Sequence, residues 1–127
     1  MKRFIYLISP NKVYKGFYKD LNAVLASKKV HFFQIRLKNL SNSKLIKVSK
    51  KIRIITKKYN VKLIINDFPI ITKKLKADGC HLGQKDGSVK GARKILKNKI
   101  IGRTCHGSKN LILKAIEEKP DYIAIGS

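Results

Sequence analysis

Acidic residues are scarce in this chain. Its 127 residues include 7 Asp and Glu against 30 Lys and Arg, which gives a formal net charge of +23 at pH 7. Tryptophan is absent, and the two cysteines are Cys80 and Cys105. No Cys and His spacing typical of a metal site links them. We therefore expect reduced, buried or partly buried thiols rather than a disulfide or metal ligands.

Long apolar runs are absent as well. No run approaches the roughly 18 apolar residues of a membrane-spanning helix, and the apolar segment within residues 1–10 is too short for a signal peptide with its cleavage site. We therefore expect a cytoplasmic protein without a membrane partner. The hydrophobic fraction of 43% is typical of a globular chain, and the length fits one domain over residues 1–127.

The excess of lysine has two interpretations. One is a surface that binds nucleic acid, because clustered cations attract phosphate groups. The other is a solvated, Lys-rich surface that reflects a compositional bias. The lysines are spread over all the predicted helices and no nucleic-acid-binding motif is present, which favours the second interpretation. The positive field would also favour a phosphorylated substrate.

Strand and helix patterns alternate along the chain. Apolar runs predict six strands, at residues 4–8, 32–38, 62–66, 79–82, 100–105 and 122–126. The residues that fit helix starts are Asp20, Ser41 or Ser43, Pro69, Ser88 and Ser108. This α/β alternation is typical of βαβ units in a parallel sheet, whose polar strand ends lie along one edge. Both an eight-unit (β/α)-barrel and an open doubly wound sheet remain compatible with it.

The second predicted strand ends in Gln34, Arg36 and Lys38. Residues spaced by two on a strand point to the same face. An amide, a guanidinium and an ammonium on one face would form an anion site, where Arg can bind phosphate oxygens in a bidentate manner. The alternative is a solvated strand face without a ligand.

Acidic residues follow the next two strands. Asn66 and Asp67 come after the third strand, and Asp86 follows the fourth. Hard oxygen ligands combined with cationic side chains predict a diphosphate bridged by Mg²⁺. Taken alone, an Asp after a strand also fits a helix cap or a turn.

The histidines give weaker signals. His81 lies inside the short fourth strand, and we expect it to be packed or hydrogen-bonded. His106 follows the fifth strand, where it fits either a proton carrier facing the site or a loop residue without a chemical role.

Five segments together resemble a known family. They are QIRLK at 34–38, IND at 65–67, ADGCHLGQKD at 77–86, IGRTCH at 101–106 and DYIAIG at 121–126. In this order they resemble the thiamine-phosphate synthase (thiamine-phosphate pyrophosphorylase) family and its thiazole tautomerase relatives. The resemblance covers essentially the whole chain.

The resemblance implies a TIM (β/α)8-barrel and a Mg²⁺-dependent condensation. The reaction joins 4-amino-2-methyl-5-(diphosphooxymethyl)pyrimidine to a thiazole phosphate and yields thiamine phosphate and pyrophosphate. By match to the family motifs, Asp67 and Asp86 would bind the metal. The residues that would bind the pyrimidine substrate are Gln34, Ile35, Arg36, Leu37, Lys38, Asn66 and Thr104. The family usually has Ser at the position of Thr104, so the hydroxyl is kept. No protein nucleophile is implied.

The chain also departs from the family. Members continue with a Thr-rich loop, a Lys and two further βα units, so we expect an incomplete barrel of about six strands with the last two units missing. It would be a fragment, a chain completed by another chain or by self-association through open sheet edges, or a non-catalytic remnant that binds pyrimidine phosphate or nucleic acid. We expect little or no synthase activity from the chain alone. The intact diphosphate residues favour a synthase over a thiazole tautomerase.

Overall fold

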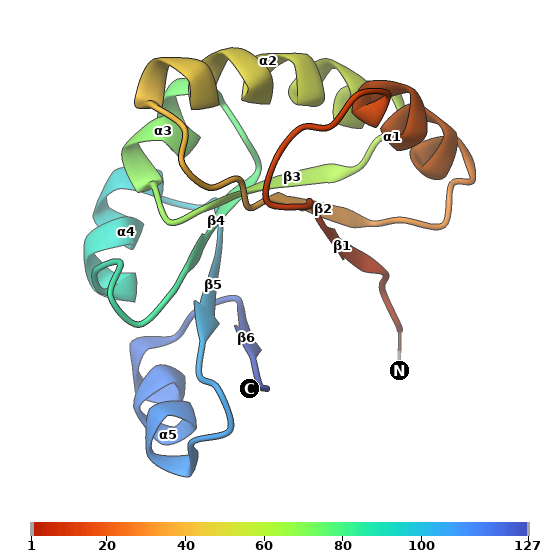
Figure 1. The fold of residues 1–127 in the computed structure, drawn as a ribbon. Coiled ribbons are helices and arrows are strands. Elements are labelled where there is room, and N and C mark those ends of the chain that lie inside the picture. The colour runs from red at the N-terminus through yellow and green to blue at the C-terminus, as the bar shows by residue number, and fades with distance from the viewer. Residues whose placement is uncertain (1, 127) are drawn as a thin grey trace. The chain divides into compact units, whose positions relative to one another are not determined.

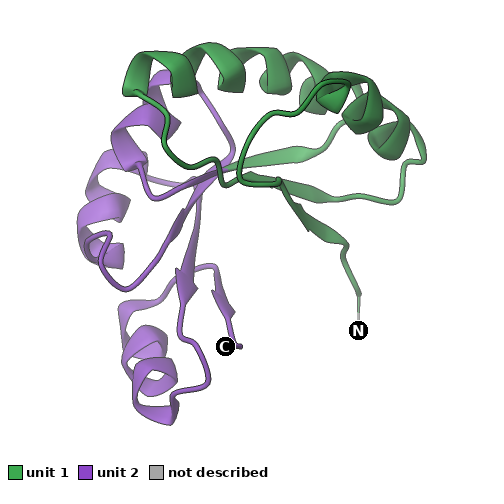
Figure 2. Ribbon diagram, in the orientation of Figure 1, with its two compact units in different colours: residues 1–64 green, residues 65–127 purple. Residues whose placement is uncertain are grey.

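The computed structural model describes residues 2–126, in which six strands alternate with five helices (Figure 1). Two compact units divide the chain, residues 1–64 and residues 65–127 (Figure 2). The boundary falls inside the third strand. The first unit contains β1 (Tyr6–Ile8), α1 (Phe17–Ala26), β2 (Phe32–Ile35), α2 (Asn42–Lys58) and the start of β3 (Lys62–Asn66).

The second unit repeats the alternation. It contains α3 (Pro69–Lys74), β4 (Gly79–Leu82), α4 (Val89–Leu96), β5 (Ile100–Thr104), α5 (Lys109–Glu118) and β6 (Tyr122–Ala124). Its sheet order is β4–β5–β6, and both pairings are parallel. In the first unit β1 pairs in parallel with β2. The predicted α/β alternation is therefore confirmed, and so are the bounds of β3 and β4.

The start of α1 differs from the prediction. Asp20 was expected to cap this helix, but Gly16 occupies the N-cap position with φ of 88°. Glycine adopts this left-handed conformation without a steric penalty. Asp20 instead lies in the first turn, where its Oδ2 accepts a 2.7 Å hydrogen bond from the Tyr14 hydroxyl. A carboxylate there is also favoured by the helix dipole.

The predicted serine caps of three later helices agree with the structure. Ser41 rather than Ser43 caps α2, and its hydroxyl accepts a hydrogen bond from the Lys44 backbone N–H. Ser88 and Ser108 cap α4 and α5 in the same way. Each cap satisfies a backbone donor that the first turn of a helix leaves unpaired, and each contributes about 1 kcal/mol. These helix starts position the loops that follow the strands.

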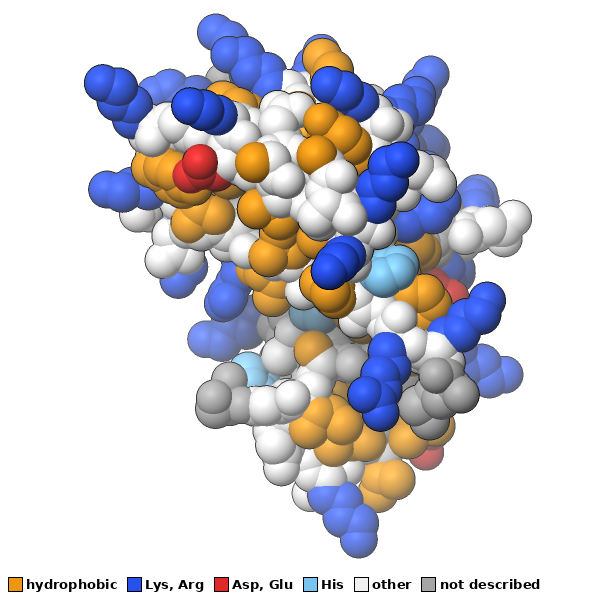
Figure 3. Space-filling view, turned by 90° about the vertical axis from the view of Figure 1, so that its right-hand side faces the viewer, with side chains coloured by type: hydrophobic (Ala, Val, Ile, Leu, Met, Phe, Trp, Pro, Cys, Tyr) orange, Lys and Arg blue, Asp and Glu red, His pale blue; other side chains and the backbone are white. Residues whose placement is uncertain are grey.

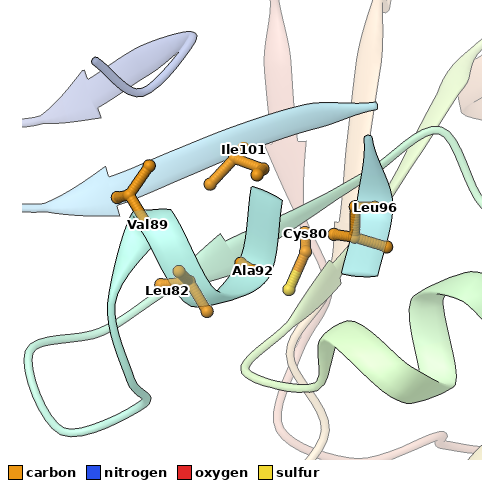
Figure 4. Packing of buried hydrophobic residues seen from close by; sticks show 6 residues of the cluster. All are labelled: Cys80, Leu82, Val89, Ala92, Leu96 and Ile101. Atoms are coloured by element: carbon orange, nitrogen blue, oxygen red, sulfur yellow. The ribbon is translucent and has the colours of Figure 1, made fainter. Parts of the chain in front are cut away.

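A tight apolar cluster forms the core of the second unit (Figure 4). Its members are Cys80, Leu82, Val89, Ala92, Leu96 and Ile101. They come from β4, α4 and β5, so α4 covers the strands through its apolar face. Each buried aliphatic side chain contributes about 1.5–3 kcal/mol through removal of apolar surface from water.

The second strand is shorter than predicted. It ends at Ile35 rather than at residue 38. The backbone N–H of Arg36 donates to the Ser9 hydroxyl at 2.8 Å, and that of Lys38 donates to the Asn11 carbonyl at 2.9 Å. These bonds join the chain to the loop after β1, so Arg36 and Lys38 lie beyond the strand. The expectation that Arg36 and Lys38 belong to the same strand as Gln34 is wrong.

The surface is as basic as the composition indicates. Lys and Arg side chains are spread over the face shown in Figure 3, with apolar and neutral surface between them. Among the helices of residues 2–126, none is both long and apolar enough to cross a membrane.

Candidate functional site

In the first unit, the candidate residues follow the carboxyl end of β2. Gln34 is buried, and its Nε2 donates a 2.7 Å hydrogen bond to the Tyr6 hydroxyl. Arg36 and Lys38 are exposed. Their charges are therefore available to an anion, whereas the orientation of the Gln34 amide is fixed from within the unit.

In the second unit, Asp67 stands at the end of β3 in a constrained conformation. Its φ is 77°, a left-handed value that Asp and Asn adopt more readily than most residues. Its backbone N–H donates to the His81 carbonyl at 2.8 Å, and its Oδ2 accepts from Asn66 Nδ2 at 2.8 Å. The predicted pair of Asn66 and Asp67 is thus a hydrogen-bonded unit.

Asp86 is held by the turn that follows β4. Its Oδ2 accepts a 2.9 Å hydrogen bond from the Gly83 N–H. A Cβ atom at position 83 would lie 2.6 Å from the same oxygen. A side chain at position 83 would therefore displace this carboxylate from its present position. Asp86 forms a turn, as the sequence allowed, and remains half-buried.

The Cys80 thiol is buried, and its pKa is raised. Burial raises its pKa to about 12, and the negative charges of Asp67 and Asp86 add to this rise, while a hydrogen bond with the Thr72 side chain opposes it. The free, buried state predicted for the two cysteines is confirmed, and a thiol with this pKa is no nucleophile at neutral pH.

These residues fit Mg²⁺. Within residues 2–126, no group of three or more His, Cys, Asp or Glu side chains gathers as a complete metal cage. Mg²⁺ commonly binds through one or two carboxylates, with water and substrate phosphates as its remaining ligands. Asp67 and Asp86, two half-buried carboxylates that follow β3 and β4, match that donor set.

Thr104, at the end of β5, is bound from two sides. Its Oγ1 lies 2.7 Å from His81 Nε2, and its backbone carbonyl accepts a hydrogen bond from Gln84 Nε2. His81 is 7% exposed, and its Nδ1 lies 2.8 Å from the Tyr122 hydroxyl. The expectation that His81 is packed and hydrogen-bonded is confirmed. The sequence did not identify Gln84 and Tyr122, because spacing alone does not reveal a partner in a distant part of the chain.

Arg103 is a further residue that sequence reasoning missed. It is buried, and its Nη1 donates to the Gly83 and Gly87 carbonyls at 3.0 and 2.7 Å. These bonds brace the turn that carries Asp86. The sequence does contain a signal for this role, because Arg103 is a charged residue within the otherwise uncharged segment 100–104. His106, after β5, is exposed and has a φ of 52°.

The comparisons with known proteins decide the family. A family model described as thiamine monophosphate synthase matches residues 5–127. The chain belongs to this family. The thiamine-phosphate synthase of Pelagibacter ubique is 58% identical over 127 residues, which cover 99% of this chain and 61% of that protein. The enzyme of the same name from Erythrobacter litoralis is 39% identical over 126 residues, with 97% and 59% covered.

A solved structure shares the fold. The thiamine phosphate pyrophosphorylase from Pyrococcus furiosus aligns with a TM-score of 0.85 and 25% identity, over 98% of this chain and 60% of that one. The match supports the α/β class with parallel strands. The chain spans about three fifths of the length of these relatives, as the covered shares of 61%, 59% and 60% state.

Proposed function

We propose that this chain is a thiamine-phosphate synthase domain, residues 1–127, that binds the pyrimidine diphosphate substrate together with Mg²⁺. The observation that supports this best is that Asp67 and Asp86 follow β3 and β4 in a member of this family, with each carboxylate held by a hydrogen bond from a neighbouring residue. Two fixed carboxylates attract a hard divalent cation, and a diphosphate is the natural further ligand of such a cation.

Each remaining candidate residue has a role in this proposal. Arg36 and Lys38 would bind diphosphate oxygens, with the planar guanidinium able to contact two of them. Gln34 and Asn66 would contact the substrate through their amides, and Thr104 through its hydroxyl. Ile35 and Leu37 belong to the same segment through the family motif. The proposal needs no protein nucleophile, in keeping with the raised pKa of the Cys80 thiol.

The chemistry is the departure of pyrophosphate from the pyrimidine methylene carbon and attack of the thiazole nitrogen there. Bound Mg²⁺ would stabilise the charge that builds on the departing pyrophosphate. Arg36 and Lys38 would stabilise the same negative charge. Asn66 would keep the Asp67 carboxylate oriented through the 2.8 Å bond to Oδ2. The thiazole phosphate would be the second small-molecule substrate.

Calorimetry tests the proposal. The 127-residue chain is titrated with 4-amino-2-methyl-5-(diphosphooxymethyl)pyrimidine, with Mg²⁺ and with excess chelator. The matched control ligand is the pyrimidine alcohol without phosphates, and inorganic pyrophosphate reports the anion alone. We expect the diphosphate to bind most tightly, and more tightly with Mg²⁺. Equal binding with and without Mg²⁺, or no binding, would contradict the proposal.

We also propose that the chain self-associates through its sheet edges. The strand order places β1 and β6 at the edges. Ile5, just before β1, is 50% exposed, Ile8, in β1, is 48% exposed, and Ile125, after β6, is 63% exposed. Unpaired strands with apolar neighbours favour pairing with another chain. Sedimentation equilibrium of the purified chain would show a dimer or larger species, and a monomer at all concentrations would contradict the idea.

A further inference from the structure

We propose that His81 and Gln84 are positioning residues for Thr104, with Tyr122 setting the hydrogen-bond direction of the His81 ring. The inference rests on the proposed function in one respect, the contact of the Thr104 hydroxyl with the pyrimidine substrate. Both positioning residues lie at or just beyond the end of β4, three positions apart, and both contact the end of β5. One binds the hydroxyl of Thr104 and the other its carbonyl.

The register of the sheet explains how His81 reaches its partners. His81 pairs with Gly102, and Gly102 pairs with Tyr122, so these three residues form one row across β4, β5 and β6. Thr104 is two residues beyond Gly102 and therefore shares its face of the sheet. Its hydroxyl comes within 2.7 Å of His81 Nε2 along that face.

Gly102 makes the contact across the middle strand possible. His81 and Tyr122 lie on strands that are not neighbours, so their backbones are separated by about two strand spacings of 4.8 Å. Because Gly102 has no side chain, the two rings stack across it with centroids 5.5 Å apart. A Cβ atom built at Gly102 would overlap the Tyr122 ring. The missing side chain is thus a condition for the Tyr122–His81–Thr104 chain.

The chain of hydrogen bonds controls what Thr104 offers to a ligand. In a neutral imidazole one nitrogen donates and the other accepts. If the Tyr122 hydroxyl donates to Nδ1, then Nε2–H donates to Thr104, and the Thr104 proton is directed elsewhere. With the opposite tautomer, Thr104 donates to Nε2 and offers only lone pairs. The direction of the Tyr122–His81 hydrogen bond therefore decides whether the Thr104 hydroxyl can donate a hydrogen bond to a ligand.

Gln84 completes the arrangement by fixing the backbone. Its amide donates to the Thr104 carbonyl from the loop after β4. The hydroxyl and the carbonyl of Thr104 are then both held from the β4 side, which limits the rotation of the peptide that carries the side chain. His81 and Gln84, the first and last residues of the HLGQ sequence at 81–84, thus both bind Thr104 at the end of the neighbouring strand β5.

Nuclear magnetic resonance tests the geometry without any ligand. Ring ¹⁵N shifts of His81 are measured in the 127-residue chain and in Thr104→Val, Thr104→Ser and Tyr122→Phe, with His31 and His106 as internal references. We expect Thr104→Val to shift the Nε2 resonance, Tyr122→Phe to shift Nδ1, and Thr104→Ser to leave both near their original positions. Gln84→Met should shift the Thr104 carbonyl ¹³C resonance. Unchanged His81 shifts in Thr104→Val would overturn the inference.

Calorimetry with the pyrimidine diphosphate and Mg²⁺ tests the consequence for binding. The variants are His81→Phe, which keeps a ring against Tyr122, Thr104→Val, and the double variant. We expect each single change to weaken binding about three- to ten-fold, as for the loss of one hydrogen bond. The double variant should bind no more weakly than the singles, because both act through one hydroxyl.

The outcomes separate the two proposals. Additive effects in the double variant would overturn the positioning role even if the substrate binds. A wild-type chain that does not bind the diphosphate would overturn the proposed function, and the ring ¹⁵N shifts would then decide the positioning of Thr104 by themselves. Melting temperatures of all variants show which losses come from unfolding.

Discussion

In the first unit, the charged candidate residues after β2 are exposed, whereas in the second unit Asp67, Asp86 and Thr104 are half-buried and each is hydrogen-bonded to a neighbour. The units also differ in charge, since residues 1–64 contain one acidic residue, Asp20, and residues 65–127 contain the other six. The first unit would therefore attract an anion mainly through its positive charge, an attraction that dissolved salt weakens. In the second unit, hydrogen bonds and packing hold the candidate side chains in fixed positions. Substitutions in the two units should fail in different ways.

The largest expected effect on binding is at Asp67. Asp67→Asn keeps a residue type that tolerates φ of 77° but removes the negative charge. We expect Mg²⁺-dependent binding of the pyrimidine diphosphate to weaken by at least about ten-fold, as with other changes at metal sites. Calorimetry measures this, with Asp78→Asn as the control for loss of an acidic residue elsewhere in the same unit. Unchanged Mg²⁺ dependence would remove Asp67 from the site.

In the second unit, we expect a substitution at Gly102 to lower the free energy of unfolding. Gly102→Ala places a methyl group against the Tyr122 ring, and overpacking of this kind costs about 1–3 kcal/mol. Urea unfolding followed by circular dichroism measures the loss. The matched control is Gly107→Ala, because a Cβ atom at Gly107 meets nothing within 4 Å. Equal stabilities of the two variants would show that the Tyr122 ring moves aside freely.

The first unit should respond to charge and salt. Arg36→Gln and Lys38→Gln each remove an exposed cation, and we expect binding of the diphosphate to weaken about three- to ten-fold in dilute buffer. Because exposed charges are screened, this loss should shrink as the ionic strength is raised. Lys28→Gln, also exposed and in the same unit, is the control. A loss that does not depend on salt would mean that these residues act through geometry instead.

The smallest effects come from the helix caps, which test whether the units unfold together. Ser41→Ala affects α2 in the first unit, and Ser88→Ala affects α4 in the second, each by about 1 kcal/mol. One cooperative transition should shift equally in both variants, as expected for a single domain. If each variant shifts a different transition in calorimetric scans, the units unfold separately and the single-domain proposal is wrong.

The sequence by itself determined the order of the elements and the kinds of chemical group at the strand ends. Apolar runs located β3 and β4 because both are buried, and Ser88 and Ser108 marked helix starts because capping is a local interaction between residues three apart. The residue types at Asn66, Asp67 and Asp86 predicted a cation site for the same reason: their chemistry is visible without a fold.

Only the tertiary structure decided where β2 ends and what binds Thr104. Arg36 leaves the strand because its N–H bonds to Ser9, 27 residues earlier. His81 meets Thr104 and Tyr122 across 23 and 41 residues, and Arg103 braces Gly83 across 20. Periodicity and capping act over one or two turns or along a single strand, whereas these bonds depend on which strands become neighbours and in which register. That register, with glycine at position 102, is what brings the rings of His81 and Tyr122 together.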